Sequence, residues 1–245
     1  MATGYIKDER LSIARGLIRG ASSIHKFGAV PEMSINTTGT VWDVNDTIYP
    51  WSSFSSASTL TVQAVNASDN AKKLTIEGLD GNYDPLSEEV TLSSSGTVTT
   101  SNSFIRVFRG FISEGADNVG AIDVRISSTT VLKINIGQSQ TLMGVYTIPA
   151  GKIGYLLKGV CTAQNGADAT GSMFVRYFGQ TAFRIGHSFE VTGAGGKYEY
   201  EFGVPLPIPE KSDIDVRVST RSNNGRYTAG FDIILLDNPR TMDVS

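Results

Sequence analysis

Residues 141–159 read TLMGVYTIPAGKIGYLLKG, and this stretch decides the fold class of the chain. Apolar and β-branched residues bring the chain in from Val145 to Ile148 and take it out again after Lys152. Between these runs, Pro149 holds φ at about −65° and Gly151 accepts a positive φ, which is typical of a tight turn. The stretch therefore predicts a β-hairpin. No Asp, His or Cys gathers around the turn, so an architectural role is favoured over a catalytic one.

The same two-residue alternation recurs on both sides of this stretch. The clearest runs are residues 59–65, 73–79, 104–112, 122–126, 172–178, 183–191, 213–218 and 229–236. Many short strands separated by Gly, Asn and Pro turns predict an all-β chain with two β-sandwich domains, the second one jelly-roll-like. The turn-rich run at 114–118 predicts the boundary between them. The expected organisation is an N-terminal arm over 1–28, a first sandwich over 29–116 and a second sandwich over 117–245.

The arm carries the one convincing helix pattern. From Asp8 to Ile18, the apolar residues Leu11, Ala14, Leu17 and Ile18 form one stripe, and Asp8 favours a helix start. This short helix either caps the β core or docks on a neighbouring subunit. Under the second interpretation, Leu11, Leu17 and Ile18 are interface residues.

An irregular segment follows the arm and concentrates large aromatic side chains. It holds Trp42, Tyr49, Trp51 and Phe54. Such side chains dominate the burial of cores and interfaces alike. The segment therefore packs against its own domain or contributes these four residues to a contact between subunits; a sugar-stacking face is a third interpretation.

Composition and charge exclude several classes of protein. The 245 residues carry a net charge of −3, whereas nucleic-acid binders usually show a basic face. The sequence contains no apolar run of about 18 residues, so no membrane span is expected. The first 20 residues lack the apolar core of a secretory signal, which predicts synthesis and retention in a cytoplasm. The single cysteine, Cys161, excludes an intramolecular disulfide.

The sequence shows no motif that predicts catalytic, cofactor-binding or metal-binding residues. His25 and His187 lack metal-ligand spacing, and the glycines of 193–196 are not followed by the Lys-Ser/Thr of a phosphate-binding loop. Asp213 and Asp215 share one face of a strand, where they form either a solvated surface or an oxygen site for calcium. The sequence therefore predicts a protein that is not an enzyme and needs no cofactor.

Four phrases resemble uncharacterised virion structural proteins of tailed bacteriophages, especially aquatic ones. The phrases are SIHKFGAVPEMSINTTGTVWDVNDTIYPW (23–51), LTIEGLDGNYDPLSEEVTLSSSGTVTTSNSFIRV (74–107), YTIPAGKIGYLLKG (146–159) and PIPEKSDIDVRVS (207–219). The similarity covers residues 22 to 238 and contains no catalytic residues. It implies a component of the virion, made in the host cytoplasm.

Within that class, the expected function is that of a capsid decoration or cement protein that binds the major capsid shell. The chain is expected to associate with copies of itself as a homotrimer or another symmetric oligomer. A tail, neck or baseplate component, with tail proteins as partners, is the alternative. A host-receptor or carbohydrate-binding module is the alternative from a different class. Neither nucleic acid nor membrane is an expected partner.

Overall fold

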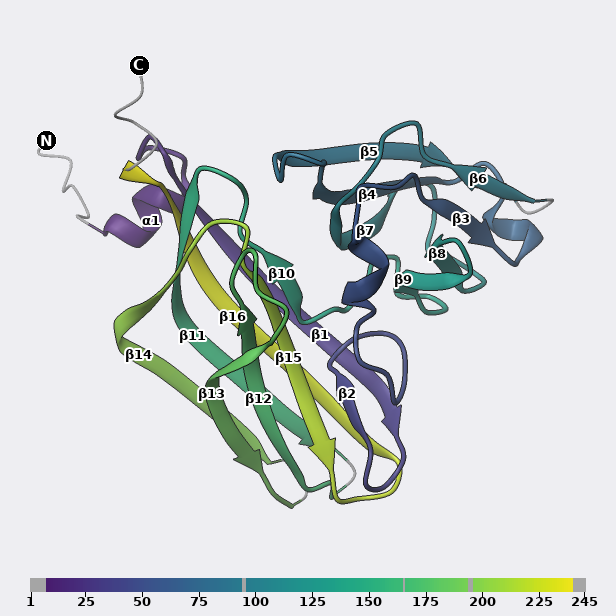
Figure 1. Ribbon diagram of the computed structural model, residues 1–245. Coiled ribbons are helices and arrows are strands. Elements are labelled where there is room, and N and C mark those ends of the chain that lie inside the picture. The colour runs from purple at the N-terminus through teal and green to yellow at the C-terminus, as the bar shows by residue number, and fades with distance from the viewer. Residues whose placement is uncertain (1–7, 94–95, 165, 194–195, 240–245) are drawn as a thin grey trace, which may run out of the picture.

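The computed structural model describes residues 8–93, 96–164, 166–193 and 196–239, and it is all-β apart from short helical turns (Figure 1). The first half contains α1 (Glu9–Ala14), β1 (Ala21–Met33), β2 (Thr38–Thr40), η1 (Trp51–Phe54), β3 (Thr61–Ala64), η2 (Ala67–Asp69), β4 (Lys73–Leu79), β5 (Pro85–Thr91), β6 (Thr97–Thr99) and β7 (Arg106–Glu114). The second half contains β8 (Ile122–Ile126), β9 (Thr129–Ile134), β10 (Val145–Thr147), β11 (Lys152–Gln164), β12 (Ala169–Arg176), β13 (Arg184–Val191), β14 (Lys197–Ile208), β15 (Asp213–Thr220) and β16 (Gly225–Asp237).

Strands from both ends of the chain build the larger of two units, called here the main unit. One of its sheets has the order β1-β16-β11-β14, and the other has the order β10-β15-β12-β13 with β2 also paired to β15. All pairs are antiparallel, and the two sheets share one core. Along β15, the alternate residues Ile214, Val216 and Val218 point into this core, as the period-two pattern predicts.

Strands β3 to β9 form a second unit, called here the inserted unit, which lies beside the main unit (Figure 1). Its sheets have the orders β6-β3-β8-β9 and β5-β4-β7, and their buried side chains belong to one core. The chain leaves the main unit after β2 and returns at β10. Segment 51–140 is thus an insertion within a unit that the two ends of the chain close.

This strand pairing differs from the expected division at residue 116. β8 and β9 follow that boundary, yet β8 pairs with β3, which precedes it. β1 pairs with β16 from Ala21↔Leu236 to Met33↔Gly225, so residues 21–28 form a strand of the main unit rather than part of an arm. The alternation that reveals a strand carries no information about its partner, which can lie more than 200 residues away.

The stretch at 141–159 also differs from the expected hairpin. Gly151 has the positive φ of +69° that the predicted turn requires. However, β10 pairs with β15 in one sheet, whereas β11 pairs with β14 and β16 in the other. The turn is therefore a corner between sheets. A Cβ on Gly154 would lie 2.5 Å from Ile148 Cδ1, so a larger residue there would require the buried Ile148 side chain to shift.

The N-terminal helix is shorter than the pattern predicts. α1 begins after Asp8, whose side chain accepts hydrogen bonds from the backbone N–H groups of Arg10 and Leu11, as expected for an N-cap. It ends before Gly16, which has a φ of +70°. Leu17 and Ile18 therefore lie outside the helix. Residues 1–7 of the expected arm lie outside the described residues.

Candidate functional site at the junction of the two units

The segment that connects β2 to β3 carries the chain from the main unit to the inserted unit. Its aromatic residues Trp42, Tyr49, Trp51 and Phe54 are each at most 7% exposed. The Tyr49 ring meets the ring of Trp42 edge-on at 5.1 Å and that of Trp51 at 4.8 Å, and its hydroxyl donates to the carbonyl of Val107 on β7. These four side chains fill the junction. Their burial within this chain fits the interpretation that the segment packs against its own protein, and the interpretation of them as subunit-interface or sugar-stacking residues stays a prediction.

The outer face of β15 supplies two carboxylates to the same junction. Asp213 and Asp215 point away from the core of the main unit and are 2% and 0% exposed, so the expectation of a solvated face is also wrong. Asp215 accepts hydrogen bonds from Trp51 Nε1, Thr40 Oγ1 and Arg217 Nε, each at 2.8 Å. Burial raises the pKa of Asp215, although the charge of Arg217 and these hydrogen bonds act in the opposite direction.

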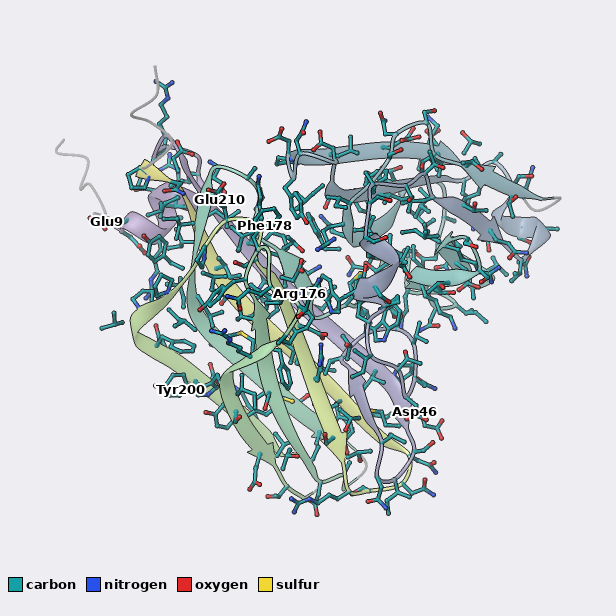
Figure 2. The ribbon with its side chains drawn as sticks, in the orientation of Figure 1. Glu9, Asp46, Arg176, Phe178, Tyr200 and Glu210 are labelled. Atoms are coloured by element: carbon teal, nitrogen blue, oxygen red, sulfur yellow. The ribbon has the colours of Figure 1, made fainter. Side chains whose placement is uncertain are left out.

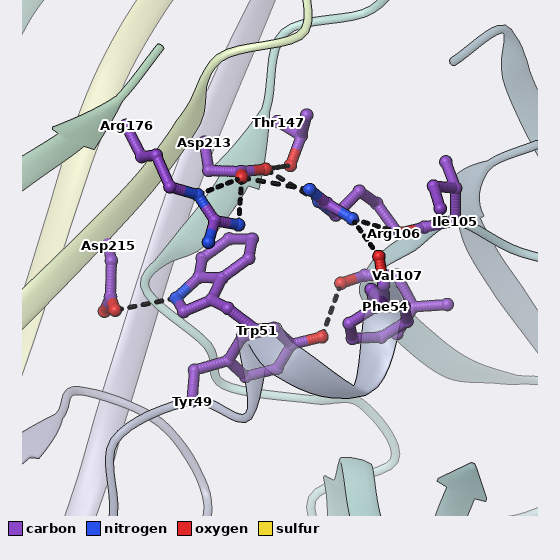
Figure 3. Close-up of polar contacts among 10 residues, drawn as sticks. All are labelled: Tyr49, Trp51, Phe54, Ile105, Arg106, Val107, Thr147, Arg176, Asp213 and Asp215. Atoms are coloured by element: carbon purple, nitrogen blue, oxygen red, sulfur yellow. Dashed lines mark hydrogen bonds and ion pairs between the residues drawn. The ribbon is translucent and has the colours of Figure 1, made fainter. Parts of the chain in front are cut away.

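Asp213 joins the two units directly (Figure 3). Arg106, from β7 of the inserted unit, donates through Nε to Asp213 Oδ1 at 2.7 Å and through Nη2 to Oδ2 at 3.1 Å. Arg176, from β12 of the main unit, donates through Nε to Oδ2 at 3.0 Å, and Thr147 donates to Oδ1 at 2.7 Å. One carboxylate therefore receives both arginines, a bidentate and charge-assisted arrangement.

Arg106 is held in place by more than its ion pair. Its Nη1 donates to the carbonyl oxygens of Phe54 and Ile105, at 3.2 and 2.6 Å. Burial disfavours the charged guanidinium, but the hydrogen bonds and charge of Asp213 outweigh burial and raise the pKa of Arg106. The set Trp51, Arg106, Arg176, Asp213 and Asp215 is called here the junction cluster.

A second polar contact between the units lies at Lys26 on β1. Its Nζ donates to the carbonyl oxygen of Phe108 on β7. Burial, with the nearby charge of Arg109, lowers the pKa of Lys26 to about 7. Asp43, also buried, accepts hydrogen bonds from the backbone N–H of Leu142 and from Asn135 Nδ2, but burial still raises its pKa to about 8. The contact between the units therefore includes two groups that titrate near neutral pH.

A pocket of about 410 Å³ opens beside the junction cluster and is called here the junction pocket. Its wall consists of Trp51, Ser52, Phe54, Ser55, Tyr83, Arg106, Arg176, Tyr177, Phe178, Gly179, Gln180, Lys211 and Asp213. Figure 2 shows Arg176 and Phe178 on the side of the main unit that faces the inserted unit. Residues of both units form this wall, so the pocket exists only while the units stay together.

The remaining candidates lie away from this junction. Leu11, Leu17 and Ile18 are 44%, 64% and 38% exposed, which leaves them accessible to a partner. α1 contacts β1, and Arg10 forms an exposed ion pair with Glu201 of β14 at 3.3 Å.

The described part of the chain contains no cluster of metal-ligating side chains. Its His, Cys, Asp and Glu residues form no group of three or more that could hold a metal ion. His25 pairs with Asp232, and His187 hydrogen-bonds to the Tyr198 hydroxyl at 2.7 Å, so the histidines serve separate contacts. Cys161 is buried, and burial raises the pKa of its thiol to about 12. None of the described helices has the length and apolar character needed to cross a membrane.

Sequence reasoning missed Arg106, Arg176 and Asp213 as a unit. The available signal is the alternation in residues 213–218, DIDVRV, where every second residue is charged and the others are apolar. A solvated strand and a strand with a second, buried polar face give the same pattern. The two cases are distinguished only by the tertiary structure, in which the segment between β2 and β3 covers the face of β15 that carries Asp213 and Asp215.

Comparison with known proteins identifies no family. No protein-family model matches the chain, and no curated protein matches it. Among solved structures, infectious bursal disease virus of the Gt strain matches with a TM-score of 0.22 and 10% identity, over 89% of this chain and 73% of that chain. The VP2 subviral particle of the same virus matches with a TM-score of 0.23 and 8% identity, over 90% and 73%. Such scores establish neither a shared fold nor a shared function.

Proposed function

We propose that this chain is a non-enzymatic structural protein of a virion and that its main unit is a jelly roll. The strand order of the main unit carries this proposal. β2 and β10 pair with successive parts of β15, so together they occupy one strand position that the inserted unit interrupts. Numbered in chain order, β1 is position 1, β2 with β10 is position 2, and β11 to β16 are positions 3 to 8. The order of positions is then 1-8-3-6 in one sheet and 2-7-4-5 in the other. Jelly rolls with this two-sheet form build viral capsid domains, and also lectins.

The same proposal gives the inserted unit a role. A sheet pair fixed to the jelly roll by a buried ion pair projects as a rigid second body, suited to a defined contact in an assembly. The resemblance of four sequence phrases to virion proteins of tailed bacteriophages points to the same class. The proposed location is therefore the virion, after synthesis in the host cytoplasm.

Within the virion, we place the chain on the capsid shell as a decoration or cement protein. It would act as a symmetric oligomer, such as a homotrimer, bound to the major capsid protein. Exposed apolar residues support a contact with partners. They are Leu11 in α1, Leu17 just after it, and Ile185 and Val204 on the edge strands β13 and β14, the last two at 61% and 83% exposure. Isolated apolar residues are common on monomers, but those on unpaired strand edges favour association.

A tail, neck or baseplate component, bound to tail proteins, is the alternative within this class. A host-receptor or carbohydrate-binding module remains the alternative from another class, and the junction pocket is the observation that favours it. The net charge of −3 argues against nucleic acid as a partner. Neither nucleic acid nor membrane is part of the proposal.

Cryo-electron microscopy of purified native particles tests the location. Many copies on the head lattice are the expected result. One ring or cluster on the tail would replace decoration with the tail alternative. If the chain is absent from purified particles, the virion proposal fails altogether.

A binding assay with intact heads tests whether the exposed apolar residues of the N-terminal segment, Leu11, Leu17 and Ile18, anchor the chain on the shell. Deletion of residues 1–28 is unsuitable, because it would remove much of β1, which pairs with β16. The variant Leu11→Gln/Leu17→Gln/Ile18→Gln leaves the sheets intact and should weaken binding to heads. Ile136→Gln is the matched control, because Ile136 is 70% exposed on the inserted unit. Equal binding by both variants would contradict anchoring through this face.

A further inference from the structure

The junction pocket has an excess of positive charge. Its wall contains three cationic side chains, Arg106, Arg176 and Lys211, and one carboxylate, Asp213, which leaves 3 − 1 = 2 positive charges. Partly enclosed sites of one charge sign attract ions of the opposite sign. The pocket wall therefore favours an anion.

Arg176 and Lys211 have N–H groups that donate no hydrogen bond to the described residues. Arg176 uses Nε and Nη2 for Asp213, while its Nη1 donates to none of the described residues. Lys211 forms no ion pair within the described chain; instead, its Nζ lies 5.7 Å from the ring centre of Tyr83 and 5.2 Å from that of Phe178. A planar guanidinium edge and a nearby ammonium group together match a carboxylate or a phosphate.

The aromatic part of the wall comes from both units. Tyr83 belongs to the turn between β4 and β5, and Phe178 belongs to the loop between β12 and β13; their rings meet edge-on at 5.6 Å. Phe178 is nevertheless 59% exposed, an unusual position for a large apolar ring. Exposed aromatic rings beside cations offer a face on which a ring-shaped ligand can stack.

The deep wall of the pocket is fixed before any ligand arrives. Arg106 and Asp213 are 6% and 2% exposed and hydrogen-bonded to each other, and Arg176 is held by the hydrogen bond that its Nε donates to Asp213. A site that is already ordered loses less conformational entropy on binding. Ser52, Ser55 and Gln180 add polar side chains at the wall.

We propose that the junction pocket binds a small ligand that carries an oxyanion, a carboxylate or a phosphate, on a ring. The oxyanion lies against Arg176 and Lys211, and the ring lies against Phe178 and Tyr83. Binding is expected to stabilise the two units against separation, because the ligand contacts both. This site is independent of the proposed role in the virion.

Titration calorimetry with the full chain tests this site. Benzoate and phenyl phosphate are the probes, and phenol, acetate and inorganic phosphate are the partial ligands that lack either the anion or the ring. At least one probe should bind roughly tenfold more tightly than every partial ligand, since each half of the ligand contributes a charged or stacking contact. The tighter of the two probes identifies the head group.

Two variants separate this site from general charge effects. Lys211→Gln removes the charge but keeps a flexible polar side chain, one bond shorter, at a half-exposed position with no ion-pair partner among the described residues. It should weaken binding of the tighter probe roughly tenfold. Arg226→Gln removes one positive charge from an exposed position on β16 outside the pocket wall and should leave binding unchanged. Thermal unfolding of both variants verifies that they fold.

Four results would overturn the proposal. The first is that neither probe binds, and the second is that phenol binds as tightly as the probes. The third is that inorganic phosphate binds as tightly as the probes, which would indicate an adventitious ion only. The fourth is that the Lys211→Gln and Arg226→Gln variants bind the probe equally. None of these results depends on where the chain lies in a virion.

Discussion

Arg106 and Asp213, 107 residues apart in the sequence, form a buried ion pair with two hydrogen bonds that joins the inserted unit to the main unit. Side-chain exposures of 7% and 3% mean that neither charge can recover its hydration if the other is removed. Loss of one partner of a buried pair typically costs about 3–5 kcal/mol. The position of the inserted unit therefore depends on this pair.

The first prediction concerns this ion pair. Arg106→Met removes two hydrogen bonds to the buried Asp213 but leaves Arg176 as its cationic partner, so it should lower the free energy of unfolding by about 1–3 kcal/mol in urea titrations. Arg109→Met is the control on the same strand, because Arg109 pairs with Glu77 at 3.3 Å on the surface. The free energy of unfolding of this control variant should fall by less than about 1 kcal/mol. Equal losses would contradict a special role for Arg106.

The second prediction concerns the hydrogen bond between Trp51 and Asp215. Trp51→Phe keeps an aromatic ring in the junction but leaves Asp215 without the donor at 2.8 Å. Because Asp215 is fully buried, the free energy of unfolding should fall by about 1–3 kcal/mol. Trp42→Phe is the comparison, since Trp42 donates at 3.2 Å to a neutral carbonyl and a hydroxyl. A larger loss from Trp42→Phe would mean that volume, not the charge-assisted bond, controls the junction.

The third prediction concerns pH below neutrality and depends on Asp43. The folded state keeps the Asp43 proton up to about pH 8, because its pKa is raised to about 8, whereas the unfolded chain releases it near 3.8. The folded state therefore binds more protons between these values. The free energy of unfolding should fall as pH rises through this range, by up to about 1.4 kcal/mol per pH unit. Asp43→Asn, which mimics the protonated carboxyl, should flatten this part of the curve.

The fourth prediction concerns pH above neutrality and depends on Lys26. Its pKa is lowered to about 7 in the folded state, while the unfolded chain holds the proton up to 10.5. Here the unfolded chain binds more protons, so stability should rise with pH from about 7 to about 10.5. Together with Asp43, this gives a minimum of stability near pH 7–8, measurable by urea titration across pH. Lys26→Met should abolish the rise; a rise that persists in this variant would assign it to another group.

The fifth prediction separates folding from assembly. Leu17 is 64% exposed and follows α1, so Leu17→Gln should change the free energy of unfolding by less than about 0.5 kcal/mol. If Leu17 belongs to a subunit contact, the same change should shift sedimentation equilibrium toward smaller species. Unchanged self-association would remove Leu17 from the interface.

The sequence by itself determined the class of secondary structure. Period-two alternation placed β15 and β16 correctly, because side chains of a strand alternate between two faces whatever their partners are. Turn chemistry is equally local, so Gly151 was assigned to a turn from its neighbours alone. The start of α1 next to Asp8 is equally local, because an acidic residue is favoured at a helix N-terminus and the Asp8 side chain bonds only to the backbone N–H groups of Arg10 and Leu11.

Only the tertiary structure decided which strands meet and which faces are buried. The pairing of β1 with β16 closes the main unit around an insertion, and no local pattern encodes a partner at that separation. The sequence predicts a solvated face for Asp213 and Asp215, because the pattern of a polar strand face is the same whether solvent or a second layer of protein covers it. The connecting segment buries that face, and the geometry there, rather than composition, turns Arg106, Arg176 and Asp213 into one cluster.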